Sequence, residues 1–293
     1  MKKLLLILSL FCSQAFAAWP EKDITIIVPY PPGGANDRIA RQLSISMEAI
    51  LKRNVNILNV AGGGNALAIN EMERMDPDYT FMLPNGEIIT GPASQGKDSY
   101  KNFHPVSIFA TAPQMVYANP AVTRAEFVAS ARRGDELKVA VPDLANPATI
   151  WLDNVKPLKV IKVPYKGGAQ TVFAVTAKQV DYGVGTIANG WGALTQNQIV
   201  PIMIGDSKRS PLLPDVPTYL ELGFKGKPNV LWFGLIALNR INPKVEERVA
   251  TITEFAVNTD GMRKLSETGL EIRPRNQKDS QKIYQHDIDN LSK

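Results

Sequence analysis

Cysteine is almost absent from the sequence, because the 293 residues contain only one, Cys12. It lies in an apolar run that follows Lys2 and Lys3 and ends near Ala17, which is the pattern of a secretory signal peptide. We expect residues 1–17 to be removed by cleavage after Ala17, which leaves a mature chain without cysteine. That absence excludes disulfides, thiol chemistry and thiolate metal sites from the mature protein.

Groups that enzymes use for catalysis are also scarce. The only histidines are His104 and His286, and neither accompanies a G-x-S-x-G serine motif. No H-x-x-x-H, clustered-carboxylate or EF-hand pattern suggests a metal, and no glycine loop matches the G-x-G-x-x-G or G-K-[ST] patterns of nucleotide sites. We therefore predict that the protein is not an enzyme and uses no metal or cofactor. A secreted hydrolase is a disfavoured alternative that would require turnover of an ester.

Long apolar runs and strong charge are missing as well. After the N-terminal segment, no stretch approaches the roughly 18 apolar residues of a membrane span. The formal net charge is +5, and the basic residues are scattered along the chain. Ordinary solvated surface charge explains this pattern better than a nucleic-acid site does, so no nucleic-acid partner is expected.

The chain begins, after this segment, with a strand, a glycine corner and a helix in immediate succession. The run Ile24–Val28 consists of β-branched residues, which suits a buried parallel strand. A Pro-Pro-Gly-Gly corner follows, and then apolar residues recur at helical spacing, with Asn36 or Asp37 as the expected helix cap. Such a corner leaves backbone N–H groups free at the positive end of a helix dipole. The arrangement predicts an anion-binding site.

The same arrangement recurs along the chain. A strand leads into a glycine loop and a helix at 55–75 and again at 160–180, with weaker versions after 137–141 and 180–184. The copies have no fixed period, which argues against a solenoid. They are typical of an α/β fold in which several strand ends open into one crevice.

Further elements complete this α/β pattern. The remaining predicted strands are 79–83, 108–117, 200–205 and 230–238, and the remaining predicted helices are 124–133, 243–255 and 279–291. No flexible linker separates them, so two domains would be joined by ordered strands that act as a hinge. Tyr30, Tyr165 and Trp232 are aromatic candidates for the wall of a pocket, and each is equally compatible with a core position.

Six motifs, in order along the chain, carry a specific resemblance. They are WPEKDITIIVPYPPGGANDRIARQLS at 19–44, AGGG at 61–64, FHPVSIFATAPQMVYANP at 103–120, VPYKGG at 163–168, KRSPLLPDVPTYLELGF at 208–224 and LWFGLIAL at 231–238. Together they resemble the periplasmic substrate-binding receptors of tripartite tricarboxylate transporters, called the Bug family. The resemblance covers nearly the whole mature chain.

The resemblance implies a two-lobed α/β fold of the type II periplasmic-binding-protein class. Each lobe would be a mostly parallel sheet flanked by helices, and the lobes would close over a ligand like a Venus flytrap. The implied division is a signal peptide at 1–17, lobe 1 at 18–118 plus 225–293, and lobe 2 at 119–224. The segment between Val141 and Val163 is shorter than in the family and lacks its Gly/Ser-rich loop and full helix.

The resemblance also implies a function and partners. The protein would capture a small carboxylate in the periplasm, such as a di- or tricarboxylate, an aromatic acid or an acidic amino acid. It would deliver this ligand to the membrane permease subunits of a tripartite transporter, and it would act as a monomer. The alternative is a ligand-dependent signalling or interaction protein of the same fold that presents itself to a sensor kinase.

Loops at positions that match the family are implied as the ligand contacts. In lobe 1 these contacts are Pro32, Gly33, Gly34, Asp37, Gly62, Gly63, Gly64 and Asn85. In lobe 2 they are Asp143, Asn146, Thr149, Lys166, Gly167, Gly168 and Thr186. Because backbone amides bind any carboxylate alike, the sequence predicts a class of ligand and not one compound.

Overall fold

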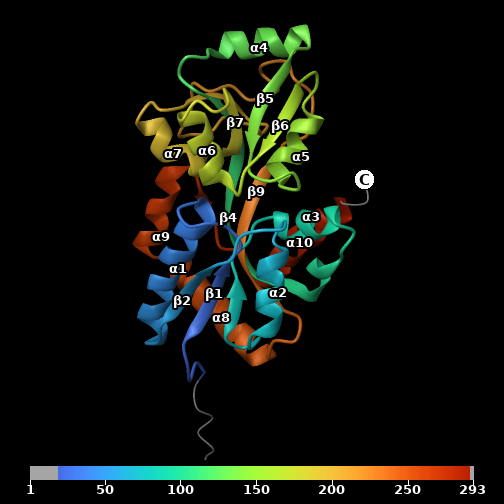
Figure 1. Cartoon of the computed structure of the whole chain (residues 1–293). Coiled ribbons are helices and arrows are strands. Elements are labelled where there is room, and N and C mark those ends of the chain that lie inside the picture. Colours follow the sequence, from blue (N-terminus) through green and yellow to red (C-terminus); the bar gives the residue numbers. More distant parts are fainter. Residues whose placement is uncertain (1–18, 291–293) are drawn as a thin grey trace, which may run out of the picture.

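Two long strands that run between the two halves of the molecule organise the fold (Figure 1). The computed structural model describes residues 19–290, so the predicted signal peptide and its cleavage site lie outside the described residues. The two strands are β4 (Phe103–Ala118) and β9 (Val230–Leu238), which pair antiparallel. We call the half that contains β1 (Ile24–Val28) lobe 1 and the half that contains β5 (Glu136–Val141) lobe 2. The predicted two-lobed α/β architecture is confirmed.

Lobe 1 combines the first part of the chain with its last part. Its strands lie in the order β2-β1-β3-β9-β4, in which β1 pairs parallel with β2 and β3, and β9 pairs antiparallel with β3 and β4. The elements of the first part, besides β1 and β4, are α1 (Ala35–Leu51), β2 (Val55–Asn59), α2 (Ala66–Arg74), β3 (Thr80–Met82), α3 (Glu87–Ser94) and the short 3-10 helix η1 (Ser99–Asn102). The elements that follow β9 are α8 (Pro243–Val257), α9 (Asp260–Lys264), the 3-10 helix η2 (Leu265–Thr268), β10 (Glu271–Ile272) and α10 (Gln277–Asn290).

Helix α1 forms where the apolar pattern predicted a helix. Its side chains Ile39, Leu43 and Met47 recur four positions apart and are fully buried in the lobe-1 core. Burial of side chains of this size contributes roughly 1.5–3 kcal/mol each. Packing of one apolar face therefore holds α1 in place, with its N-terminus directed at the gap between the lobes (Figure 1).

The predicted cap of α1 is wrong. The helix begins at Ala35, and Gly34 is its N-cap, without a side-chain hydrogen bond. Asn36 and Asp37 lie inside the first turn, and the amide of Asn36 donates to the carbonyl of Leu83 instead of capping the helix. The start of α1 is therefore fixed by contacts with neighbouring loops, which the local sequence does not reveal.

Lobe 2 is formed by the middle of the chain. Strand β5 pairs parallel with β6 and β7, and the second half of β4 pairs antiparallel with β7 and β8. Its elements besides β5 are α4 (Arg124–Arg133), α5 (Pro147–Asn154), β6 (Lys159–Pro164), α6 (Gly168–Thr176), β7 (Tyr182–Thr186), α7 (Ile187–Thr195) and β8 (Val200–Ile204). Parallel pairing is thus limited to three strands in each lobe, and the shortened segment before β6 still contains an eight-residue helix, α5.

Strand β4 contributes to the cores of both lobes. Its residues up to Ala112 pack in the lobe-1 cores, and its residues from Met115 onward pack in the lobe-2 cores. The strand pairing changes at the same place, since Pro113 lies opposite Val230 of β9 and Gln114 lies opposite a residue of β7. The chain therefore passes between the lobes at Pro113 and Gln114. Which residues move together with each lobe, divided at 118/119 and 224/225, stays a prediction.

The helices of the described chain include one that the sequence pattern does not predict. Helix α3 contains Gly91 and Pro92, which normally weaken or end a helix, and it nevertheless forms eight residues long. Among the helices within residues 19–290, none combines the length and the apolar character that crossing a membrane requires.

Candidate ligand-binding cavity

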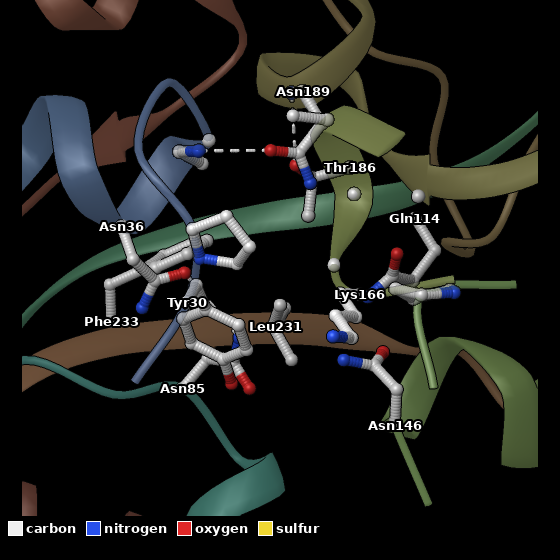
Figure 2. Close-up of a pocket in the computed structure, with 18 residues that line it drawn as sticks. Tyr30, Asn36, Asn85, Gln114, Asn146, Lys166, Thr186, Asn189, Leu231 and Phe233 are labelled. Atoms are coloured by element: carbon white, nitrogen blue, oxygen red, sulfur yellow. Dashed lines mark hydrogen bonds between the residues drawn. The ribbon is translucent and has the colours of Figure 1, made fainter. Parts of the chain in front are cut away.

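A cavity lies between the lobes, where β4 and β9 meet the end of β7 and the loops that follow β1, β3, β5 and β6 (Figure 2). It encloses about 490 Å³ of space free of protein atoms, including solvent at its mouth. Its walls are formed by Tyr30, Pro31, Gly34, Ala35, Asn36 and Asn85 of lobe 1, by Pro142, Asn146, Lys166, Gly167, Gly168, Ala169, Gly185, Thr186 and Asn189 of lobe 2, and by Gln114, Leu231 and Phe233 of the crossing strands. The carboxyl ends of parallel strands meet here, which is where ligands bind in open α/β sheets.

Five helices begin at this cavity. They are α1 and α3 of lobe 1 and α5, α6 and α7 of lobe 2, and each has a residue of its first turn or of the preceding loop in the cavity wall. The first N–H groups of a helix have no partner within the helix and carry partial positive charge. Five such ends around one space favour a bound anion.

The charged side chain of the cavity wall is positive, as are the N-terminal ends of the helices. Lys166 is the one charged residue among those that line the cavity, and no aspartate or glutamate lines it. Figure 2 shows Lys166 among the polar residues that line the cavity, with Gln114 and Asn146. Over residues 19–290, no group of three or more His, Cys, Asp or Glu side chains is arranged to hold a metal ion. The site is thus built to attract negative charge through protein groups.

One set of hydrogen bonds joins the lobes beside α1. The N–H of Ala35, the first residue of α1, donates to Asn189 Oδ1 at 2.9 Å (Figure 2). The guanidinium group of Arg38 donates to the carbonyl of Ala188, one residue earlier in α7. The amide of Asn189 also occupies the space next to Gly168, since a Cβ atom at Gly168 would lie 2.0 Å from Asn189 Nδ2. Asn189 therefore connects the helix ends of both lobes.

A second set of hydrogen bonds joins the lobes beside α3. Glu87 Oε2 accepts a hydrogen bond from Asn146 Nδ2 at 2.6 Å and one from the hydroxyl of Tyr30 at 3.4 Å. The hydroxyl of Thr90 donates to the carbonyl of Ala145 at 2.6 Å. Burial raises the pKa of the Glu87 carboxyl to about 7, although the hydrogen bond from Asn146 lowers it in part. An acid that titrates near neutral pH is thereby placed between the lobes.

Two asparagines hold the lobe-1 loops of the cavity together. Asn36 Nδ2 donates to the carbonyl of Leu83 at 3.1 Å, and Asn85 Nδ2 donates to Asn36 Oδ1 at 3.5 Å. Asn85 Oδ1 in turn accepts the N–H of Glu87 at 2.9 Å, at the first residue of α3. These bonds fix the loop after β1 against the loop after β3, so that both face lobe 2.

Seven of the fifteen ligand-binding residues predicted from the sequence line the cavity. They are Gly34, Asn85, Asn146, Lys166, Gly167, Gly168 and Thr186. The other eight lie outside its wall: Pro32, Gly33, Asp37, Gly62, Gly63, Gly64, Asp143 and Thr149. Contact of the seven with a ligand stays a prediction.

Asp37 and Gly33 pair with each other. Asp37 Oδ2 accepts the N–H of Gly33 at 3.0 Å and the Nε–H of Arg41 at 2.9 Å. Partial burial alone would raise the pKa of Asp37, but these hydrogen bonds and one from Asn59 hold it below its usual value. The amide of Gly33 is therefore already occupied by a carboxylate of the protein, and the neighbouring Pro32 is exposed.

The glycine loop Gly62–Gly64 packs against α3 and not against the cavity. A Cβ atom at Gly91 of α3 would lie 2.2 Å from the carbonyl oxygen of Gly64. The side-chain amide of Gln95, also next to α3, donates to the carbonyl of Gly63 at 2.8 Å. Glycine is needed at Gly64 and Gly91 because the loop and the helix approach each other closely there.

Asp143 and Thr149 shape the lobe-2 loop that presents Asn146. Asp143 Oδ1 accepts the N–H of Ala145 at 2.9 Å, and the hydroxyl of Thr149 donates to the carbonyl of Asp143. Both side chains thus bond within their own loop. Their effect on the cavity is indirect, through the position of Asn146.

The three aromatic candidates take different places. Tyr30 lines the cavity, whereas Trp232 lies in a lobe-1 core and Tyr165 packs beside a lobe-2 core. Leu231 and Phe233, on either side of Trp232, line the cavity instead, because successive residues of a strand face opposite sides.

Three polar residues of the wall, Asn36, Gln114 and Asn189, are not among the predicted ligand contacts. Gln114 and Asn189 are each the one side-chain amide in a mostly apolar run, in ATAPQMVYA and GTIANGWGA. A polar residue buried within such a run needs a partner, and this is the one signal in the sequence that could have indicated them.

Comparison with known proteins agrees with this geometry. A family model described as a tripartite tricarboxylate transporter family receptor matches residues 39–293. The chain belongs to this family. The receptor is 26% identical to protein BugT of Bordetella pertussis over 267 residues, which cover 84% of the receptor and 81% of the relative. The predicted Bug-family membership is confirmed.

Solved structures show the same fold. The receptor matches the periplasmic binding protein BugD with a TM-score of 0.84 at 22% identity, over 94% of the receptor and 96% of BugD. It matches MatC of Rhodopseudomonas palustris with bound malate at a TM-score of 0.83 and 23% identity, over 93% and 98% of the two chains. The predicted fold class is confirmed. The family and these neighbours are solute-binding proteins, which also confirms the prediction that the receptor is not an enzyme.

Proposed function

We propose that the receptor captures a small carboxylate in the cavity between its lobes. The observation that carries this proposal is the convergence of five helix N-termini on a wall that contains Lys166 and no acidic residue. An anion there gains from the positive ends of the helix dipoles, although some first N–H groups, such as that of Ala35, already bond to the protein. The malate in the solved structure of MatC supports a carboxylate as the anion.

The proposed contacts come from both lobes. The N–H of Ala35 is bonded to Asn189, so the backbone N–H groups of Asn36 in α1 and of Gly168 and Ala169 in α6 would hold the carboxylate oxygens, together with the side chains of Asn85, Asn146 and Thr186. The carbon skeleton of the ligand would lie against Leu231 and Phe233 of β9, which give the cavity an apolar floor.

Closure of the lobes is part of the proposal. The bonds from Ala35 to Asn189 and from Asn146 to Glu87 connect side chains and backbone of different lobes, so they exist only when the lobes are together. We propose that β4 and β9 bend where they pass between the lobes and that a ligand favours the closed arrangement by contacting both lobes.

The receptor would act outside the cytoplasm as the collecting part of a transporter. We propose that signal cleavage after Ala17 releases a monomer into the periplasm, and that the closed receptor passes its carboxylate to the membrane permease subunits of a tripartite transporter. Family membership supports this role.

A thermal-shift screen of the purified mature protein tests the proposal. The panel contains mono-, di- and tricarboxylates, aromatic acids and acidic amino acids, with the corresponding amides as uncharged controls. A ligand at about 100 times its Kd adds roughly 2.7 kcal/mol to the free energy of unfolding, which raises Tm by roughly 5 °C for a protein of this size. We expect at least one acid to do this and its amide not to do so. A folded protein that responds to no acid would contradict the proposal.

Replacing Gly168 by alanine should weaken carboxylate binding by about tenfold or more. The new Cβ atom would lie 2.0 Å from Asn189 Nδ2 and 2.6 Å from Asn189 Cγ, so the amide of Asn189 must move away from Ala35. Loss of about 1.4 kcal/mol of closed-state stabilisation corresponds to a tenfold higher Kd. Isothermal titration with the best acid of the screen measures this change.

The matched control is Gly192→Ala in α7. A Cβ atom at Gly192 meets no atom within 4 Å, and its backbone is not in the left-handed region. This variant should bind as the wild type does. Equal Kd values for Gly168→Ala and the wild type would show that Asn189 does not help to hold the closed receptor.

A further inference from the structure

The side chain of Gln114 is buried in the cavity wall without a hydrogen-bond partner. The residue is 1% exposed, and neither its Nε2 nor its Oε1 is bonded to any group of the described protein. A buried amide normally bonds through both atoms, because leaving one unpaired costs about 1–3 kcal/mol. Gln114 is one of the residues that line the cavity, and Figure 2 shows its amide directed into it.

The backbone around Gln114 leaves its side chain little freedom to find a partner within the protein. Its N–H donates to the carbonyl of Asn229 at 3.3 Å, and its carbonyl accepts the N–H of Gly205 at 2.7 Å. Its Cβ atom packs closely on Gly205, since a Cβ atom added at Gly205 would lie 3.1 Å from the Cβ atom of Gln114. On the adjacent strand it pairs with Thr186, another residue of the cavity wall. The amide is therefore held at the floor of the cavity, where the chain passes between the lobes.

A primary amide presents two different requirements. Nε2 is a donor and needs an acceptor, whereas Oε1 is an acceptor and needs a donor. An ionised carboxylate supplies acceptors only, so a ligand with no other polar group would leave Oε1 unpaired. A hydroxyl, amino or amide group on the ligand supplies the missing donor.

We infer that Gln114 is a specificity-determining residue that selects carboxylates bearing a hydroxyl, amino or amide hydrogen-bond donor over unsubstituted acids. The inference rests on the proposed function, because it assigns the Gln114 amide to the same ligand. Of the residues in the wall, Gln114 is suited to this choice, since both of its amide atoms are free of protein partners at a fixed place in the floor.

Two pairs of acids that differ by one hydroxyl test the inference. Calorimetric Kd values are measured for L-malate against succinate and for 2-hydroxyglutarate against glutarate, with the wild type and with Gln114→Met. Methionine has a similar length and no donor. We expect at least one hydroxy acid to bind about tenfold or more tightly than its unsubstituted partner, and the ratio to approach one in Gln114→Met through weaker binding of the hydroxy acid.

Other outcomes overturn the inference in distinguishable ways. If both members of a pair bind equally, or if Gln114→Met retains the preference, Gln114 bonds only to water, and the carboxylate proposal still stands. If the acid that raises Tm most in the thermal-shift screen carries no donor group, the inference about Gln114 is also overturned, and the carboxylate proposal still stands. If no acid binds to the folded wild type, the proposed function and this inference fail together. Gln114→Asn keeps the side-chain amide and serves as a second variant if Gln114→Met does not fold. We expect Gln114→Asn to fold and to retain a preference for the hydroxy acid.

Discussion

Between pH 8 and pH 4.5, the free energy of unfolding of the receptor should rise by about 3 kcal/mol relative to that of its Glu87→Gln variant. The carboxyl of Glu87 is buried between the lobes, and its pKa is raised from 4.5 to about 7. Between pH 7 and pH 4.5 the carboxyl of Glu87 holds a proton in the folded protein and has released it in the unfolded chain. Stability therefore increases as pH falls below 7 and levels off below 4.5. The difference between these two pKa values, 4.5 and about 7, corresponds to about 3 kcal/mol of stability over this pH range.

Urea unfolding curves of both proteins at several pH values measure this difference. Glutamine keeps an oxygen that can accept the hydrogen bonds from Asn146 and Tyr30, and it has no charge to lose. Glu247→Gln is a control that removes an exposed carboxylate from α8, and it should retain the wild-type gain in acid. Parallel pH profiles for the wild type and Glu87→Gln would show that Glu87 does not titrate in the folded protein.

Replacing Gly91 by alanine should destabilise the receptor by about 3 kcal/mol. A Cβ atom at this position would lie 2.2 Å from the carbonyl oxygen of Gly64 and 2.9 Å from its carbonyl carbon. Both are backbone atoms, so either α3 or the glycine loop must shift. Because α3 also carries Glu87 and Thr90, the shift should disturb the bonds that join the lobes, and ligand binding should weaken as well.

Chemical unfolding of Gly91→Ala beside Gly192→Ala separates this contact from a general effect of alanine. Gly192→Ala should unfold at the wild-type urea concentration or slightly above it, because nothing lies near its new Cβ atom and alanine favours a helix over glycine. If the two variants are equally stable, the close approach of α3 to Gly64 does not occur in solution.

The local units of the fold could be predicted because they follow from neighbouring residues. The run of β-branched residues before the first glycine corner forms β1, and the apolar residues at helical spacing after it form the buried face of α1. Helix α3 could not be predicted in this way, since Gly91 and Pro92 oppose a helix locally. Packing of Gly91 against Gly64, far away in the sequence, explains why glycine is there.

The candidate site was predicted less completely, for a related reason. A glycine loop shows that something approaches the backbone, but not what approaches it. At Gly168 it is the side chain of Asn189 in the cavity wall, and at Gly64 it is a helix of the protein itself. Gln114 enters the cavity because β4 changes its pairing partner there, and that change depends on strands far apart in the sequence.

The shared strands also set the order in which the molecule can fold. The cores of lobe 2 are made of residues between Met115 and Phe224, one continuous segment that precedes β9 along the chain. The main core of lobe 1 needs side chains as late as Leu270, which must join partners near the start of the chain, beginning with Ile24. Contacts of such long separation form late. A chain that folds from its N-terminus onward can therefore complete lobe 2 first, while the first strands of lobe 1 stay unpaired with β9 until the last part of the chain joins them.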